Sequence, residues 1–138
     1  MPRPSLKDER RAEILAAYER CIARHGVEGA TLERIAEEAG LARALIRHNV
    51  GNKDELFASF LDRYLERASA DVDDLFESLP ETDRIPTLLE WLFDPAYAST
   101  SEVSVTNALI TAALDDRALA ERLNAWSAEF VAGIDREL

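Results

Sequence analysis

The sequence predicts an all-α fold, and three observations lead to this prediction. The 138 residues include only five glycines and five prolines, and alanine, leucine, glutamate and arginine are abundant, as is typical of helices. Apolar residues recur at helical spacing along most of the chain, and no segment alternates as a strand would. Prolines and capping residues fall between the periodic segments, where one helix should end and the next begin. We therefore expect about seven helices and no sheet.

The first helix is expected over about residues 6–25. Its apolar stripe, which should be buried, comprises Ile14, Ala17, Tyr18, Cys21 and Ile22. Cys21 and His25 lie one turn apart, a spacing that two ligands of a metal site can have. No second pair is available to complete such a site, so a buried free cysteine and a histidine near the helix C-terminus are favoured, and no metal site is expected.

Residues 31–50 predict two short helices joined by a tight glycine turn. Thr31 is placed to cap the first helix, and Gly40 lies where a helix C-terminus favours a left-handed backbone. The second helix should bury Ile46 and Val50 on one face. This is the layout of a helix-turn-helix, whose second helix enters the major groove of DNA.

The opposite face of this second helix is basic, with Arg43, Arg47 and His48. Two like charges one turn apart destabilise an isolated helix by roughly a few tenths of a kcal/mol. A polyanion facing the two arginines would offset that cost. An ordinary solvated helix face is the alternative for two arginines alone.

Charge is divided unevenly along the chain. Residues 1–53 hold ten Lys/Arg and eight Asp/Glu, which gives a net charge of +2. Residues 54–138 hold six Lys/Arg and nineteen Asp/Glu, which gives a net charge of −13. A phosphate-binding surface is therefore expected only in the N-terminal part, where Lys7, Arg11 and Lys53 flank the basic helix.

The segment from about residue 10 to residue 60 resembles the N-terminal DNA-binding domain of the TetR (tetracycline-repressor-like) family of transcriptional regulators. The matching pieces are a first helix ending at Gly26, Thr31, the turn Ala39-Gly40-Leu41, the recognition segment to His48 and Asn52-Lys53-Asp54-Glu55-Leu56. The resemblance implies a repressor that binds a palindromic operator in double-stranded DNA and is released by a small-molecule effector. The residues expected to contact DNA are Thr31, Arg43, Ala44, Leu45, Arg47, His48, Asn52, Lys53, Lys7 and Arg11.

The sequence departs from the family pattern in the recognition helix and after it. Ala44 and Leu45 replace a frequent glycine and threonine, and Arg47 replaces a frequent tyrosine. Leu45 cannot hydrogen-bond to a base, but it can contact a thymine methyl group. Gly51 stands where proline is frequent and is expected to loosen that corner, while Asn52 should cap the next helix.

Residues 1–52 are expected to form the DNA-binding domain, and residues 53–138 an effector-binding and dimerisation domain. A long helix should run to about Leu79, and further helices should follow Asp83, Ser99 and Asp116, with Ser99 and Glu102 as a capping box. TetR-like proteins usually continue with two more helices that form the dimer interface. We therefore expect a truncated chain that is a monomer or a weak dimer, although the family implies a homodimer. The alternative is a family member that dimerises through other surfaces.

An apolar ligand pocket is a further candidate site in the second domain. Its candidate lining residues are Trp91, Phe93, Tyr97, Thr106, Asn107, Thr111, Trp126 and Phe130. Ordinary core packing is the alternative for each aromatic side chain.

No catalytic constellation was found, because no serine or cysteine has a credible His/Asp partner and no glycine-rich loop is present to hold phosphate. The sequence thus predicts neither an enzyme nor a cofactor. No apolar run approaches the roughly 20 residues needed to span a membrane, and we expect a cytoplasmic protein. The alternative function is a truncated helical interaction module that no longer binds an operator productively.

Overall fold

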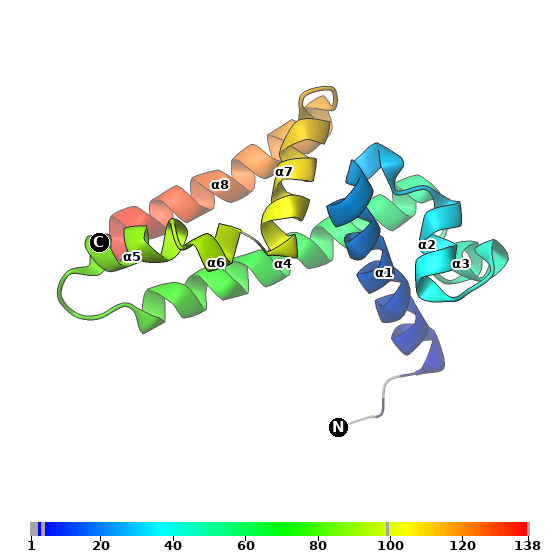
Figure 1. The fold of residues 1–138 in the computed structure, drawn as a ribbon, viewed down its shortest axis with the longest axis horizontal. Coiled ribbons are helices and arrows are strands. Elements are labelled where there is room, and N and C mark those ends of the chain that lie inside the picture. Colours follow the sequence, from blue (N-terminus) through cyan, green and yellow to red (C-terminus); the bar gives the residue numbers. More distant parts are fainter. Residues whose placement is uncertain (1–2, 4, 99, 138) are drawn as a thin grey trace. The chain divides into compact units, whose positions relative to one another are not determined.

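The computed structural model describes residue 3, residues 5–98 and residues 100–137, without the side chains of residues 97, 98 and 137. These residues form helices and no strand, which confirms the all-α prediction (Figure 1). The helices are α1 (Leu6–Gly29), α2 (Leu32–Ala39), α3 (Arg43–Val50), α4 (Lys53–Ser78), α5 (Arg84–Leu92), α6 (Pro95–Ala98), α7 (Ser101–Ala113) and α8 (Arg117–Glu137). None of them combines the length and the apolarity that a bilayer crossing requires.

The described residues contain one helix more than the seven expected, because the single turn α6 follows the predicted break at Asp94-Pro95. The Asp94 carboxylate accepts a hydrogen bond from the backbone N–H of Ala96 at 2.8 Å, which starts this turn. The expected capping residue Ser99 lies outside the described residues. Thr100 is the N-cap residue of α7, and its side chain makes no capping hydrogen bond.

The chain divides into two compact units, Met1–Arg63 and Tyr64–Leu138, and the long helix α4 contributes to both. The first unit has a dense core. The side chains in it that are completely buried include Ile14, Ala17, Tyr18, Ile22, Ala30, Ile35, Ile46 and Leu56. Tyr18 and Phe60 pack edge to face with ring centroids 5.3 Å apart. The predicted stripe of the first helix is therefore confirmed as core.

Local signals determine where the helices of the first unit begin and end. At Gly26, α1 is interrupted by a positive φ of 76°, which confirms the predicted helix end. The Thr31 hydroxyl accepts a hydrogen bond from the backbone N–H of Arg34 at 3.3 Å. Gly40 is left-handed at φ 68° and ψ 31°, and the N–H of Leu41 donates to the Ala36 carbonyl. These contacts form the predicted helix-turn-helix corner.

The second unit has a looser core. One cluster joins buried Phe76, Leu79 and Leu88, and Val72, Leu75, Phe130 and Ile134 pack against it. The Arg84 guanidinium donates hydrogen bonds to the carbonyls of Phe76, Leu79 and Pro80. It thereby gives hydrogen-bond donors to carbonyls at and just after the end of α4, where the helix supplies few N–H groups of its own.

Candidate nucleic-acid interface

Helix α3 buries one face and exposes the other. Ile46, Asn49 and Val50 are buried, whereas Arg43, Ala44, Arg47 and His48 are exposed. Leu45 is half-buried at the edge between the two faces. The exposed face therefore carries the basic side chains that the sequence placed there, one helical turn apart.

Asn49 is a buried residue of this helix that the sequence analysis did not identify. Its side-chain amide donates a hydrogen bond to the Leu45 carbonyl at 2.7 Å, so its polar group is partnered inside the helix. The spacing from Ile46 to Asn49 and Val50 is that of one helical face. That spacing is the signal that could have revealed its burial.

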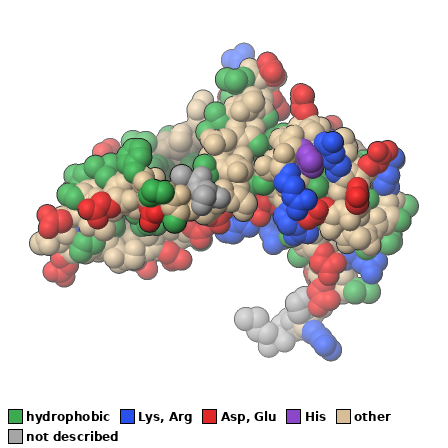
Figure 2. All heavy atoms as spheres, viewed as in Figure 1, with side chains coloured by type: hydrophobic (Ala, Val, Ile, Leu, Met, Phe, Trp, Pro, Cys, Tyr) green, Lys and Arg blue, Asp and Glu red, His purple; other side chains and the backbone are tan. Residues whose placement is uncertain are grey.

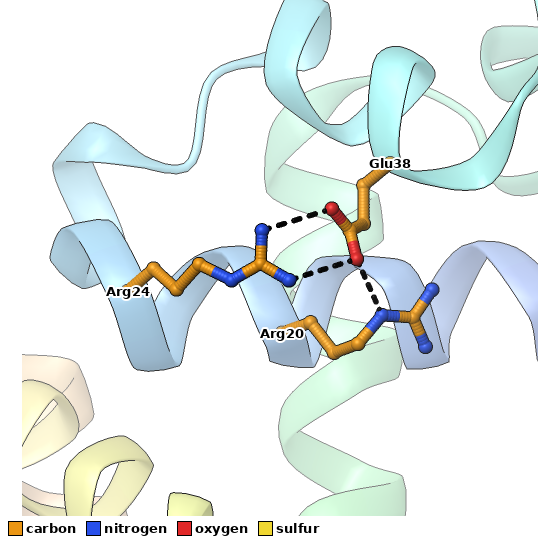
Figure 3. Close-up of polar contacts among 3 residues, drawn as sticks. All are labelled: Arg20, Arg24 and Glu38. Atoms are coloured by element: carbon orange, nitrogen blue, oxygen red, sulfur yellow. Dashed lines mark hydrogen bonds and ion pairs between the residues drawn. The ribbon is translucent and has the colours of Figure 1, made fainter.

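Two arginines of α1 are held by an acidic residue of α2 and form a clamp, which we define as Arg20, Arg24 and Glu38 (Figure 3). The Arg20 Nε atom lies 2.7 Å from Glu38 Oε1, and both terminal nitrogens of Arg24 lie 3.1 Å from the same carboxylate. The hydrogen bond from Arg20, followed by those from Arg24, lowers the pKa of Glu38 below its usual value. The clamp thus ties α2 to α1.

Other arginines of the first unit are also engaged within the protein. Arg11 donates to the Ser59 hydroxyl at 2.8 Å, and Arg34 donates to the Gly29 carbonyl at 2.8 Å. Arg43 lies 3.4 Å from a carboxylate oxygen of Glu33, and both side chains are mostly exposed. An exposed pair at that distance contributes little stability, so another anion can compete for Arg43.

The side chains of Lys7, Arg47, His48 and Lys53 differ from these, since they make no hydrogen bond or ion pair within the part of the chain that the structure describes. In the view of Figure 2, most of the visible Lys and Arg side chains lie over the first unit. The first unit therefore presents cations that its own fold does not use.

The corner after α3 requires glycine. Gly51 adopts φ 86° and ψ −154°, a conformation that is essentially restricted to glycine, and a Cβ there would overlap the Glu55 carboxylate. The expected loosening of this corner relative to a proline stays a prediction. The Asn52 side chain accepts a hydrogen bond from the backbone N–H of Glu55 at 2.8 Å, which confirms the predicted cap.

The two capping side chains keep hydrogen-bond donors that caps do not use. The Thr31 hydroxyl oxygen and the side-chain carbonyl oxygen of Asn52 act as acceptors in their caps. The hydroxyl proton of Thr31 and the amide N–H₂ of Asn52 can therefore still be donated to an external acceptor such as a phosphate oxygen.

Two hollows lie among the described residues of the second unit, and we call them the large and the small cavity. The large cavity has a volume of about 540 Å³ and is lined by Tyr64, Leu65, Arg67, Ala68, Asp71, Val72, Trp91, Glu102, Thr106, Leu109, Ile110, Leu123, Asn124, Trp126 and Ser127. The small cavity, of about 340 Å³, is lined by residues that include Asp73, Phe76, Trp126 and Phe130. The large one falls within the size range of small-molecule sites.

Only some of the predicted pocket residues line these cavities. Trp91 and Thr106 line the large cavity, Phe130 lines the small one, and Trp126 borders both. Phe93 lines neither and is 80% exposed, because α5 ends before it.

The remaining predicted pocket residues lie elsewhere. Asn107 and Thr111 are exposed on another face of α7, where the Thr111 hydroxyl donates to the Asn107 carbonyl. The side chain of Tyr97 lies outside the described residues. The sequence analysis missed the contribution of α4, although Tyr64, Ala68 and Asp71 follow one helical face.

Cys21 and His25 lie in different environments. Cys21 is a buried free thiol, whereas His25 is exposed, and no group of three potential ligands occurs in the described part of the chain. Burial is the main cause of the raised pKa of the Cys21 thiol, followed by the nearby Glu38 carboxylate. The interpretation as a buried cysteine is confirmed.

Residues 14–60 match the family model described as "Bacterial regulatory proteins, tetR family". The "HTH-type transcriptional repressor AcnR" of Corynebacterium efficiens is 36% identical over 85 residues, which cover 62% of this chain and 42% of that protein. The "HTH-type transcriptional regulator BetI" of Vibrio vulnificus is 26% identical over 141 residues, which cover this whole chain and 71% of that protein. The chain thus spans less than half the length of the corynebacterial repressor it matches.

A crystal structure from Pseudomonas aeruginosa PAO1, described as a candidate transcriptional regulator, has the same fold, with a TM-score of 0.69 and 24% identity. The match covers 94% of this chain and 64% of the other. The family match spans the helix-turn-helix from Ile14 within α1 to Phe60 within α4. Residues 14–60 therefore carry the DNA-binding segment that the tetR family model of bacterial regulatory proteins describes.

Proposed function

We propose that this chain is a DNA-binding transcriptional regulator, a repressor that inserts α3 into the major groove of a palindromic operator. The observation that carries the proposal is the exposed basic face of α3. Arg47 and His48 make no hydrogen bond or ion pair there in the part of the chain the structure describes, while Arg20 and Arg24 are fixed by Glu38. The corynebacterial relatives are named as transcriptional repressors, which supports the same function.

The two sets of cations have different roles in this proposal. The clamp of Arg20, Arg24 and Glu38 holds the scaffold, whereas Arg47 reads a guanine edge or binds a phosphate. Arg43 exchanges its exposed contact with Glu33 for a phosphate oxygen, because a DNA phosphate is held in a dense row of negative charge. Lys7, Arg11, Asn52, Lys53 and the Thr31 hydroxyl contribute backbone contacts, which orient the protein without reading sequence.

Base contacts by Ala44 and Leu45 are apolar in this proposal. Ala44 is exposed and Leu45 is half-buried, so either side chain can reach a thymine methyl group at the groove floor. The acidic remainder of the chain would be repelled by DNA, which favours approach through the first unit.

Release by an effector is the second part of the proposal. Helix α4 begins at the Gly51 corner beside α3 and carries Tyr64, Arg67 and Asp71, which line the large cavity. A ligand releases a repressor from DNA only if it binds the conformation that cannot bind DNA more tightly than the conformation that can. The large cavity is the proposed effector site because it is bordered by this helix.

The test is a mobility-shift titration of DNA from upstream of the coding region of this protein. Arg47→Ala is expected to weaken binding by about 1–3 kcal/mol and to leave the circular dichroism spectrum unchanged. Arg136→Ala is the matched control, because Arg136 is also exposed but lies on α8, and both variants lose one positive charge. Binding of the parent should weaken as salt is raised.

Two outcomes would contradict the proposal. Equal binding by Arg47→Ala and the parent would show that α3 is not the reading helix. Absence of any salt-dependent DNA binding by the parent would instead favour the helical interaction module.

A further inference from the structure

The large cavity has aromatic walls. Tyr64, Trp91 and Trp126 line it, together with the aliphatic side chains of Leu109 and Ile110. The carbons of aromatic rings pack against apolar groups. The faces of the rings also carry partial negative charge, so they attract cations. Arg67 already demonstrates this within the protein, since its guanidinium carbon lies 5.6 Å from the centroid of the Tyr64 ring.

The charged groups of this cavity favour a positive ligand. Asp71 and Glu102 line it and outnumber Arg67, which is engaged with the Tyr64 ring. The unit around it, residues 64–138, carries five Lys/Arg and sixteen Asp/Glu, a net charge of −11. A potential of that sign concentrates cations and repels anions at the cavity.

Several hydrogen-bond donors of the cavity are already used by the protein. The Tyr64 hydroxyl lies 2.6 Å from the Thr106 hydroxyl, and the Thr106 hydroxyl donates a hydrogen bond to the backbone carbonyl of Glu102. The Ser127 hydroxyl donates to the Asn124 carbonyl, and the Trp126 indole N–H donates to the Ser69 hydroxyl. A bound carboxylate or phosphate needs donors of this kind to replace its hydration, and these donors are not available to it.

We propose that the large cavity binds an organic cation with an apolar body, such as an alkylammonium compound. Its apolar part would contact Leu109 and Ile110, and its charge would lie between the aromatic faces and the carboxylates of Asp71 and Glu102. The inference deepens the proposed function, because it names the chemical class of the effector, and it rests on that function only for the consequence to DNA binding.

The experiment uses the intrinsic fluorescence of the full chain. The chain has two tryptophans, Trp91 and Trp126, and both line the large cavity. The probes are decyltrimethylammonium, decanol and decanoate, which share a ten-carbon tail and differ in charge, each used below its micelle-forming concentration. We expect saturable changes with decyltrimethylammonium at concentrations at least about tenfold lower than with decanoate, as for like-charge rejection worth about 1.4 kcal/mol.

Variants test whether the carboxylates at the cavity are responsible. Asp71→Asn and Glu102→Gln should each weaken binding of decyltrimethylammonium by about two- to fivefold, which is the range for exposed ion pairs. Asp73→Asn is the matched control, because Asp73 lies on the same helix and lines only the small cavity. It should change the affinity by less than either of the other two variants.

Three results would overturn the inference: decanoate binding as tightly as decyltrimethylammonium, no saturable fluorescence change with any probe, or an equal loss of affinity in Asp73→Asn. Because these titrations contain no DNA, their failure leaves the Arg47 test of DNA binding intact. Failure of DNA binding would likewise leave the fluorescence result standing.

Discussion

The two units of the chain differ in how completely they bury their apolar side chains. Six of the eight largest fully buried side chains among the described residues lie in the first unit, and only Val105 and Leu109 lie in the second. The exposed large apolar side chains that the structure describes show the reverse distribution, because all except Leu6 belong to the second unit. They are Ile85, Leu89, Trp91, Leu92, Phe93, Ile110, Leu114 and Val131.

The units also differ in charge. Residues 1–63 hold eleven Lys/Arg and eleven Asp/Glu, so the first unit is neutral overall, whereas the second has a net charge of −11. In the neutral unit, the positions of the charges matter more than their sum. Glu38 engages two arginines of α1, Arg43 of α3 makes only an exposed contact with Glu33, and Arg47 makes no ion pair within the described residues. The comparison teaches that one unit is a well-packed platform for α3, while the other retains apolar surface and cavities.

The largest effect is expected from truncating an isoleucine in each unit. Ile35→Ala removes a completely buried side chain from the first unit and should destabilise the protein by about 2–5 kcal/mol. Ile85→Ala, at a residue that is 54% exposed in the second unit, should change stability by less than about 0.5 kcal/mol. Thermal denaturation followed by circular dichroism measures both, and equal losses would remove the contrast in packing.

A second prediction compares two glycine corners within the first unit. Gly51→Ala should cost about 3 kcal/mol, because the backbone there is essentially restricted to glycine. The Glu55 carboxylate that a Cβ would overlap is the exposed end of a flexible side chain and can move aside. Gly40→Ala should cost about 1 kcal/mol, since its left-handed conformation is less strained and no atom lies within 4 Å of a Cβ.

Urea denaturation of both glycine variants gives the two free energies of unfolding. A smaller loss for Gly51→Ala than for Gly40→Ala would show that the corner before α4 is adaptable. The description of the first unit as a well-specified platform would then be wrong at this point.

The smallest effect is expected from the clamp of Arg20, Arg24 and Glu38. Because hydrogen bonds from the arginines lower the pKa of Glu38 in the folded state, its ionised form stabilises the fold. This stabilisation should be complete above the ordinary value of 4.5 and should be lost as the pH falls through the lowered pKa. Glu38→Gln should therefore melt below the parent at pH 7, with the difference shrinking under more acidic conditions.

Melting temperatures of parent and Glu38→Gln across a pH series test this prediction. Glu28→Gln is a suitable control, because Glu28 is exposed in the same unit and makes no ion pair within the described residues. A difference between parent and Glu38→Gln that does not change with pH would assign the effect to packing instead of to charge.

The sequence by itself determined the local structure of the first unit. The caps at Thr31 and Asn52, the left-handed Gly40 and the buried stripe of α1 were all predicted and are present. They could be predicted because each depends on backbone sterics or on a hydrogen bond spanning a few residues. The basic face of α3 follows in the same way from helical periodicity.

Only the tertiary structure decided which distant side chains meet. Residues far apart in the sequence come together in three places. Arg20 contacts Glu38, Arg11 donates a hydrogen bond to Ser59, and Tyr64 and Trp126 line the same cavity. No periodic pattern specifies such pairs, since a helical face predicts burial but not the partner against which it packs. Phe93 illustrates the limit, because its aromatic side chain suggested a pocket residue and the end of α5 leaves it exposed.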